Sequence, residues 1–496
     1  MTLGNFVKKQ QNIMRGDNGI NGDAQRIEQM TWLLFLKVYD TKEEEWEFHN
    51  DDYTSIIPEK LRWRNWAVSK DADGKAKADV MTGQTLLDFV NNELFPTLKN
   101  LPITETTPLK QAIVKAVFED ANNYMKDGVL LRQVINAIDD INFEEYADRH
   151  AFGEIYETIL KSLQSAGNAG EFYTPRAVTD FMVKMLNPQL GEQTADFACG
   201  TGGFLTSTLK SLENQVSSVE DREKYNAAVF GIEKKPLPYL LCITNMLIHD
   251  IDSPLIYHGN SLERNVRELE DDDKFDIIIM NPPYGGTESE GVKSNFPKEL
   301  QSSETADLFM SVAMYRLKDT GRAAIIIPDG FLFGADGAKS AIKKKLIEEF
   351  NLHTIVRLPS SVFAPYTSIT TNILFFDKTK KTDCVWFYRV DMPDGYKHFS
   401  KTKPMKVEHF DECVSWWTDR KELKDSETDT FKARSFTKTE IEARNYDLDL
   451  CGYPTVEEEV LSPEDTIREF HEKRDALNAK IDKQLVEIEK LLGIIR

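Results

Sequence analysis

The apolar positions of this chain change their spacing at about residue 150. Before that point they recur every three to four residues, which indicates amphipathic helices that pack on one another. The clearest stretch is 24–47, and 85–95 and 108–124 resume the pattern beyond a polar loop of small residues at 71–83. We therefore predict a helical domain over residues 1–150.

Between residues 151 and 460, short apolar runs alternate with helical segments, as the units of an α/β sheet require. The expected fold is a seven-stranded, doubly wound parallel sheet. Residues 285–304 are polar, contain glycine and lack periodicity, so we predict a mobile loop that orders over substrate, with a merely tolerated insertion as the alternative. The strand candidates are residues 194–198, 228–232, 255–258, 275–280, 323–327, 354–358 and 372–376.

The sequence after residue 378 becomes rich in tryptophan and charge, and we interpret it as a small extension of the central domain. From 464 to 492 it contains neither glycine nor proline, and a near-heptad spacing of apolar residues predicts one long helix. A helix that packs on its own chain and an arm that docks a partner both fit this C-terminal region, residues 461–496. The apolar seam consists of Ile467, Phe470, Leu477, Ile481, Ile488, Leu491 and Ile495.

Length and composition are those of a globular enzyme. With 496 residues, of which 41% are apolar, the chain can form two or three domains with a large core. Its five cysteines show no C-x-x-C and no paired spacing, so we predict a reducing, cytoplasmic environment. The sequence lacks the long uncharged apolar stretch that a membrane helix needs, and neither secretion nor membrane insertion is expected.

The segment NPPY, residues 281–284, directly follows the apolar run 275–280. Open α/β sheets place their chemistry at such carboxyl ends of strands. An amino group conjugated to a ring or carbonyl is a poor nucleophile, because its lone pair is delocalised. Two acceptors, Asn281 Oδ1 and the Pro282 carbonyl, would favour a tetrahedral nitrogen whose lone pair faces an electrophile.

The neighbouring residues support this interpretation of the segment as a clamp. Pro282 and Pro283 have a fixed φ and no N–H, so they stiffen the turn and do not compete for its acceptors. Tyr284 offers a face on which a base extruded from a duplex can stack, which is worth about 1–3 kcal/mol. An ordinary Asn-Pro turn at the end of a strand is the alternative.

A glycine-rich turn, DFACGTGGFL at 196–205, follows an earlier strand candidate. Its glycines permit a tight turn and a close approach of a ligand to the backbone. A nicotinamide fingerprint fits poorly, because Leu205 stands at its last glycine position and Glu233 follows Gly200 by 33 residues rather than about 20. The pattern D-x-x-x-G-x-G suits S-adenosylmethionine, with Glu233 on the ribose or, alternatively, at the N-terminus of a helix.

The order of these motifs resembles the gamma-class amino methyltransferases, and most closely the modification subunits of type I restriction-modification systems. The matching segments are EFYTP at 171–175, DFACGTGGF, FGIE, HGNSL at 258–262, NPPYGG, DLFM at 307–310 and GRAAIIIPDGFLF at 321–333. They cover roughly residues 150–380.

The resemblance implies S-adenosylmethionine as cofactor, with Thr174 as a polar contact to its methionine end and Asn260, where many relatives carry Asp, on its adenine edge. Asn281, Pro282 and Tyr284 would be catalytic. Pro283, Phe363 and Tyr366 would contact the target base, although core packing of the two aromatic residues fits equally. The implied cofactor residues are Glu171, Phe172, Tyr173, Thr174, Pro175, Asp196, Ala198, Gly200, Thr201, Gly202, Gly203, Glu233 and Asn260.

The implied reaction is direct methyl transfer to the N6 amino group of a flipped adenine, without a metal. A net charge of −21 repels phosphate at long range, and the lysines at 343–345 and at 378, 380 and 381 are as readily solvated surface groups. In the family, a separate specificity subunit reads double-stranded DNA and binds the C-terminal helix. The resemblance also implies a restriction subunit and two modification subunits for each specificity subunit.

Two other functions are compatible with the same clamp. Protein-glutamine and RNA amino methyltransferases also use an NPPY segment, and a non-catalytic assembly scaffold could retain the fold. The FYTP segment before the glycine-rich turn and the large flanking helical regions favour the DNA enzyme over the first alternative. The intact glycines, Glu233 and the complete clamp argue against the second.

Overall fold

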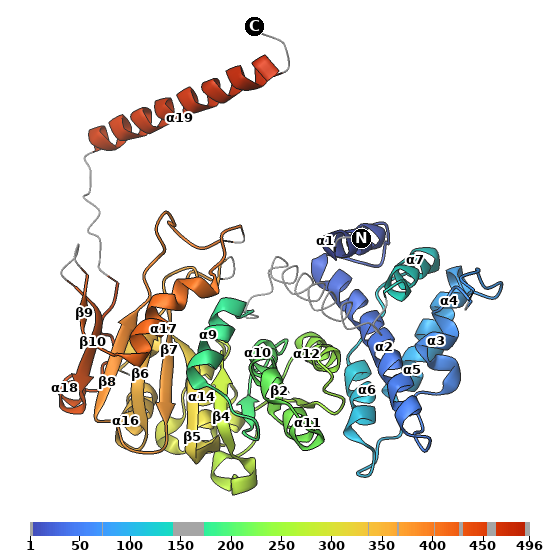
Figure 1. The fold of residues 1–496 in the computed structure, drawn as a ribbon, viewed down its shortest axis with the longest axis horizontal. Coiled ribbons are helices and arrows are strands. Elements are labelled where there is room, and N and C mark those ends of the chain that lie inside the picture. The colour runs from blue at the N-terminus through green and yellow to red at the C-terminus, as the bar shows by residue number, and fades with distance from the viewer. Residues whose placement is uncertain are drawn as a thin grey trace. The chain divides into compact units, whose positions relative to one another are not determined.

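A computed structural model describes residues 3–71, 73–141, 173–335, 337–364, 367–400, 402–425, 430–453 and 463–491 (Figure 1). The chain forms two compact units, Met1–Gly452 and Tyr453–Arg496. None of the described helices combines the length and apolar character that crossing a membrane requires.

The N-terminal region is helical, as predicted (Figure 1). The three predicted helical stretches are present, and the second is interrupted by a π-helical turn, η2. The first and last helices, α1 and α7, were not predicted. The elements are α1 (Leu3–Arg15), α2 (Asp23–His49), η1 (Glu59–Leu61), α3 (Trp63–Trp66), α4 (Gly83–Phe89), η2 (Val90–Leu94), α5 (Phe95–Lys99), α6 (Leu109–Glu119) and α7 (Gly128–Asp139).

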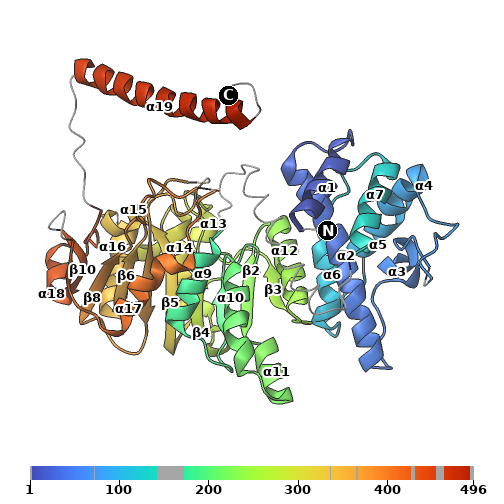
Figure 2. The same cartoon turned by 45° about the horizontal axis from the view of Figure 1, so that its top comes forward.

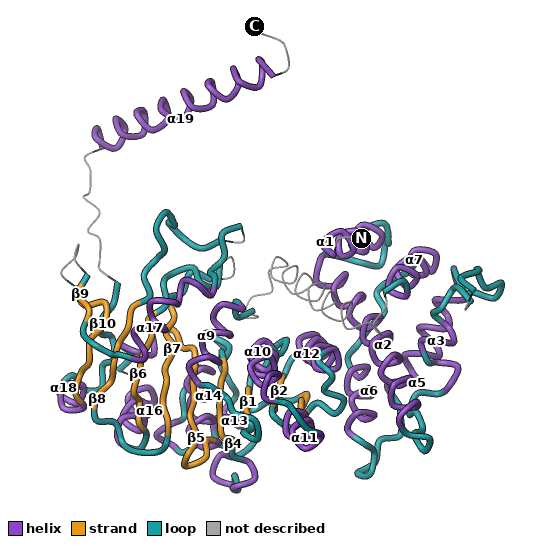
Figure 3. Tube along the Cα trace, viewed as in Figure 1, coloured by secondary structure: helices purple, strands orange, loops and turns teal. Residues whose placement is uncertain are grey.

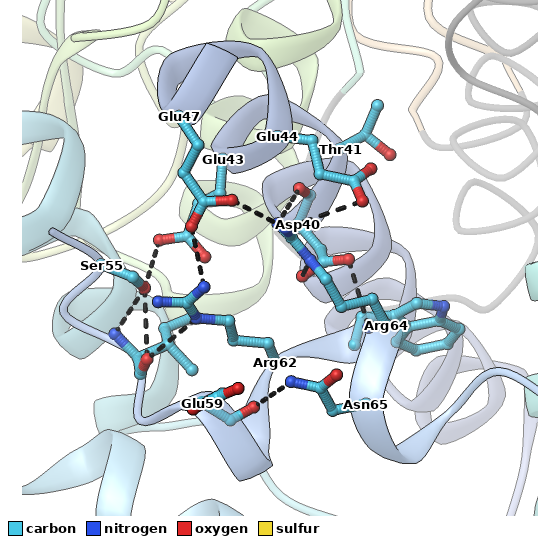
Figure 4. A network of polar contacts seen from close by, with 12 residues as sticks. Asp40, Thr41, Glu43, Glu44, Glu47, Ser55, Glu59, Arg62, Arg64 and Asn65 are labelled. Atoms are coloured by element: carbon cyan, nitrogen blue, oxygen red, sulfur yellow. Dashed lines mark hydrogen bonds and ion pairs between the residues drawn. The ribbon is translucent and has the colours of Figure 1, made fainter. Parts of the chain in front are cut away.

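The acidic end of α2 fastens the segment that follows it (Figure 4). Arg64 Nε lies 3.0 Å from Asp40 Oδ1, and Glu47 accepts hydrogen bonds of 2.8 Å from both Arg62 and Arg64. Burial raises the pKa of Asp40 to about 6, although the guanidinium of Arg64 opposes this shift. These ion pairs hold η1 and α3 against α2, beside the apolar core of the helical region.

All seven predicted strands are present, and the sheet contains three more (Figure 3). The order is β3-β2-β1-β4-β5-β7-β6-β8-β10-β9. The sheet is mixed, because β7 runs antiparallel to both β5 and β6. The strands are β1 (Thr194–Asp196), β2 (Val229–Glu233), β3 (Leu255–His258), β4 (Phe275–Met280), β5 (Leu317–Pro328), β6 (Asn351–Arg357), β7 (Thr371–Asp377), β8 (Cys384–Arg389), β9 (Leu423–Lys424) and β10 (Phe431–Thr437).

Helices cover both faces of the sheet, so it is doubly wound. Along β4, Ile277 and Ile279 belong to the apolar cluster of α9, whereas Ile278 and Met280 belong to that of α14 and α16. This alternation explains why a strand buried on both faces is apolar at nearly every position. The helices of this region are α9 (Arg176–Leu186), α10 (Gly203–Leu212), η4 (Glu213–Gln215), α11 (Val219–Asn226), α12 (Pro236–Ile248), η5 (Val266–Glu268), η6 (Asp271–Asp273), α13 (Glu290–Lys293), η7 (Lys298–Leu300), α14 (Thr305–Arg316), α15 (Asp329–Phe333) and α16 (Gly337–Glu348).

The sequence after residue 378 extends this sheet, as predicted. Strand β8 pairs in parallel with β6, and β10 pairs with β8 in the antiparallel direction. Arg389, at the end of β8 and only 1% exposed, binds Asp391 and Asp425 and so joins the end of β8 to the residue that follows β9. The remaining helices are η8 (Val407–Phe410), α17 (Asp411–Thr418), α18 (Lys438–Ala443) and, in the second unit, α19 (Pro463–Leu491).

The segment 285–304 is more ordered than the sequence indicated. It contains α13 and η7, and Phe296 between them is fully buried in the apolar cluster of α14. Asn295 Nδ2 donates to the Glu263 carbonyl at 2.8 Å. Residues 292–300 therefore carry secondary structure and a packed side chain that the sequence analysis did not predict, because one buried aromatic residue in a polar segment produces no periodic signal.

Helix α12 joins the helical region to the sheet. Figures 1 and 2 both place it between strand β2 and the helices α2 and α6, and Figure 2 shows β3 beside it on the strand side. Lys42 of α2, 5% exposed, forms an ion pair of 2.5 Å with Asp250 just beyond α12. The apolar residues of α2 and α12 belong to one continuous cluster.

Candidate functional site

Three neighbouring strands bring the predicted motifs together. Strand β1 lies between β2 and β4 and runs parallel to both, with Asp196 opposite Gly231 and Ala195 opposite Ile278. The glycine-rich turn follows β1, Glu233 ends β2, and Asn281 follows β4. The glycine-rich turn and the NPPY segment therefore occupy the same edge of the sheet, where the parallel strands end.

The glycine-rich turn depends on two left-handed residues. Gly200 has φ +53° and Gly202 has φ +81°, a region that side-chain-bearing residues rarely adopt. A Cβ atom on Gly202 would lie 2.9 Å from Cys242 Sγ of α12, whereas one on Gly200 would meet no atom within 4 Å. The turn is thus packed against α12 on one side and open at Gly200.

Two acidic side chains border this opening. Glu233 is 9% exposed and accepts hydrogen bonds from the backbone N–H groups of Gly200 (2.8 Å) and Lys235 (2.7 Å). Asp196 is 1% exposed and accepts one from Ala198 at 3.0 Å. Burial raises the pKa of Asp196 to about 8, and the neighbouring carboxylate of Glu233 adds to the shift.

This arrangement fits the ligand that the sequence predicts. An open glycine cradle, a carboxylate fixed at the end of β2 and a second, buried carboxyl group match a ligand with hydroxyl groups and a cationic end. The described residues contain no group of three or more His, Cys, Asp or Glu side chains placed to hold a metal ion.

The next predicted cofactor residues lie beside the same opening. The N–H of Gly259 donates to the Glu233 carbonyl at 3.0 Å, which places Asn260 after β3 at this edge. Asn260 Oδ1 accepts a hydrogen bond of 3.1 Å from the Leu262 N–H. Its acceptor oxygen, predicted to face the cofactor adenine, is therefore shared with its own turn.

Side chains of α12 and α9 hold the rest of the glycine-rich turn. Asn245 Nδ2 donates to the Thr201 carbonyl at 3.3 Å, and Arg176 donates to the Gly203 carbonyl at 2.9 Å. Tyr173 is half-buried against the apolar cluster of α12, and Pro175 immediately precedes α9.

The clamp contains a contact that the sequence analysis missed. Asn281 Nδ2 donates a hydrogen bond of 3.0 Å to Thr174 Oγ1, and the Tyr284 hydroxyl donates to Asn281 Oδ1. Thr174, which is predicted to contact the cofactor, therefore also accepts a hydrogen bond from the amide of Asn281. The two residues are 107 positions apart in the sequence, and the sequence analysis related them only through the order of their two motifs.

Tyr284 is half-buried against the apolar cluster of α9, and burial raises the pKa of its hydroxyl well above its usual range. Pro282 is buried and Pro283 half-buried. Phe363 is 1% exposed within the same cluster, which is the burial that its core-packing alternative predicts. Glu171, Phe172 and Tyr366 lie outside the described residues.

A polar network supports the neighbouring part of this edge. Asp329, directly after β5, accepts hydrogen bonds from Asn372 (2.7 Å) and Arg357 (3.2 Å), and its own N–H donates to the Thr370 carbonyl at 3.1 Å. Arg357 also binds Asp449 at 2.9 Å. The network fixes the two ends of the segment that connects β6 to β7.

Comparison with known proteins identifies the family. The N-6 DNA Methylase family matches residues 147–460, and the HsdM N-terminal domain matches residues 3–138. The type I restriction enzyme EcoEI methylase subunit of Escherichia coli is 50% identical over 452 residues, which are 91% of this chain and 90% of that protein.

Two solved structures have the same architecture over most of the chain. One, a modification subunit assigned to a type I restriction enzyme of Vibrio vulnificus YJ016, is 40% identical with a TM-score of 0.78, covering 91% of this chain and 96% of that one. The other, from a study of complex assembly and conformational transition in the type I restriction-modification system, is 34% identical with a TM-score of 0.79, covering 100% and 99%. The chain therefore belongs to the N-6 DNA methylases and, among them, to the methylase subunits of type I restriction enzymes.

Proposed function

We propose that this chain transfers a methyl group from S-adenosylmethionine to the N6 amino group of an adenine in double-stranded DNA, as the modification subunit of a type I restriction-modification complex. The hydrogen bond between Thr174 and Asn281 carries the proposal, because it connects the segment expected at the cofactor with the target clamp. Family membership supports the same function and does not favour a protein-glutamine or RNA methyltransferase or a non-catalytic scaffold.

The residues around the glycine-rich turn would bind the cofactor. Gly200 and Gly202 shape the cradle, Glu233 would accept hydrogen bonds from the ribose hydroxyls, and Asn260 would contact the adenine edge. Asp196 lies where a buried carboxylate would stabilise the cationic methionine end. When bound, S-adenosylmethionine supplies an electrophilic methyl group attached to a sulfonium.

The residues of the clamp would bind and orient the target. Asn281 Oδ1 and the Pro282 carbonyl would accept the two hydrogens of the adenine amino group, which localises its lone pair towards the methyl group. In this structure the Tyr284 hydroxyl donates a hydrogen bond to Asn281 Oδ1, at the position that the adenine amino group would take. When the amino group replaces this hydroxyl, the Tyr284 ring would be free to stack on the flipped base.

Asn281 acts by orientation rather than as a base, because an amide oxygen is too weakly basic to remove the proton. The proton would leave to water after transfer. Positioning of the two reactants and the pair of acceptors therefore account for the catalysis.

The proposal includes the partners of the complex. With a net charge of −21, the chain needs a separate specificity subunit to hold it on DNA, and a restriction subunit completes the complex. We assign two modification subunits to each specificity subunit, as in the family. Helix α19 exposes Ile467, Phe470, Leu477 and Ile481 along its length, which suits docking to the specificity subunit.

The proposed location is the cytoplasm. All five cysteines are free thiols, although Cys199 Sγ and Cys242 Sγ lie 4.0 Å apart. Retention of two adjacent thiols suits a reducing compartment.

The function is tested with labelled S-adenosylmethionine and an adenine-containing duplex, with and without the specificity subunit. We expect label in N6-methyladenine only when that subunit is present. Label in a glutamine-containing protein or in RNA, but not in DNA, would assign the chain to the alternative enzymes. The absence of transfer to all three substrates would support the scaffold.

A further inference from the structure

The strongly acidic chain carries a basic surface at the edge of the sheet where the clamp lies. Between residues 392 and 406 the sequence has four lysines and one aspartate, against 61 basic and 82 acidic residues in the whole chain. Lys397, Lys403 and Lys406 are exposed, as is His398. These four residues are called the basic surface below.

The sheet places this surface beside the clamp. Strand β8 is parallel to β6, and β6 and β5 are both antiparallel to β7, so β4, β5, β6 and β8 all end at the same edge. The basic surface lies on the segment that follows β8, and the clamp follows β4. Figure 3 shows the loops at this edge above the strands.

The segment is anchored rather than extended into solvent. Phe399 and Met405, 1% and 5% exposed, pack in the apolar cluster against which Tyr284 also packs. The Phe399 N–H donates to Ser361 Oγ at 2.9 Å, which ties the segment to the loop between β6 and β7. These buried anchors fix the position of the lysines relative to the site.

Local turns fix the backbone of two of these lysines. The Lys403 N–H and carbonyl are both bonded to Ser400, and the Lys406 N–H donates to His409 Nδ1 at 3.1 Å. The ion pairs found within the described ranges include none of the three lysines, whereas Lys378 and Lys380 bind Asp319 and Asp383 at 2.8 Å. Lys403 Nζ instead lies 5.3 Å from the centre of the Tyr396 ring.

We propose that Lys397, Lys403 and Lys406, with His398, bind the phosphate backbone of the duplex that carries the target adenine. This inference rests on the proposed function and adds a surface to it. Exposed ammonium groups without carboxylate partners are the groups that neutralise DNA phosphates and release counterions. Such contacts position a duplex without reading its sequence, which agrees with a separate specificity subunit.

The test measures DNA affinity of the assembled complex over a series of salt concentrations, for the wild type and for the triple variant K397Q/K403Q/K406Q. Each lost phosphate contact should lower the slope of log affinity against log salt by about 0.9. The triple arginine variant should retain the slope, because the charges remain. Cofactor affinity, measured in parallel, reports whether the fold of the site is preserved.

A matched control changes net charge equally at the other edge of the sheet. Lys378, Lys380 and Lys381 follow β7, which ends opposite to the clamp, so K378Q/K380Q/K381Q should leave the slope unchanged. Equal slopes for the wild type and K397Q/K403Q/K406Q would overturn the proposed DNA contact of the basic surface. The proposed function would stand, provided that the wild type methylates DNA. A wild-type complex that binds but does not methylate would instead overturn the proposed function.

Discussion

The hydrogen bond between Thr174 and Asn281 predicts a specific catalytic defect. Thr174→Val keeps the shape of the side chain but removes the acceptor for Asn281 Nδ2, which lies 3.0 Å away. A neutral hydrogen bond contributes about 0.5–1.5 kcal/mol, and each 1.36 kcal/mol is tenfold in rate, so methyl transfer should slow about 2- to 12-fold. If the freed amide turns over, its NH2 group would face the amino group of the base and the defect would exceed this range.

The assay is single-turnover methylation of an adenine duplex by the assembled complex, with cofactor affinity measured separately. We expect a slower transfer step at unchanged cofactor affinity, and recovery in Thr174→Ser, which restores the hydroxyl. A Thr174→Val variant that transfers at the wild-type rate would refute the orienting role. A loss confined to cofactor affinity would instead assign Thr174 to the methionine end, as the sequence alone predicted.

Four further predictions follow from the site and the C-terminal helix. Gly202→Ala should lower both the melting temperature and the cofactor affinity, because the new Cβ would lie 2.9 Å from Cys242 Sγ and the φ of this residue is positive. Gly200→Ala, which has open space around it, should lower the cofactor affinity more than the melting temperature. A Gly200→Ala variant that loses stability but keeps its cofactor affinity would contradict the role of this turn as a ligand cradle. Burial raises the pKa of Asp196 to about 8, so this carboxyl group is protonated at neutral pH and a cationic ligand must displace its proton. Cofactor affinity should therefore rise as the pH rises towards about 8, and calorimetry in two buffers should detect the released proton. Asp196→Asn should abolish that dependence, and a flat wild-type profile would disprove it. Deletion from Glu464 onward should leave cofactor binding intact and abolish assembly; a truncated chain that still co-purifies with the specificity subunit would exclude docking through α19.

Strong periodic signals made much of the fold predictable. All seven central strands were located from short apolar runs, because a strand buried on both faces is apolar at nearly every position. Helix α2 was found from its spacing and α19 from a stretch free of glycine and proline. The antiparallel direction of β7 has no local signature, since it depends on which strands pair.

The site was predictable where one residue type suits one role. Glycines at positions that require a positive φ, and an acid at the end of β2, can be recognised in the sequence. The contact of Thr174 with Asn281 could not be, because it joins two elements through a fold-dependent approach. The burial of Phe363 likewise has no signature in the sequence, and Phe399 and Met405, which anchor the segment of the basic surface, carry no periodic signal.

The central claim is that Asn281 orients the target amino group in front of the cofactor. It is tested most directly by the single-turnover methylation rate of Asn281→Ala in the assembled complex, with cofactor and DNA both saturating and their binding confirmed. The account predicts that transfer falls by at least about 100-fold, as for the loss of a preorganised hydrogen-bonding group in other enzymes, while cofactor affinity changes little. Transfer near the wild-type rate would contradict it.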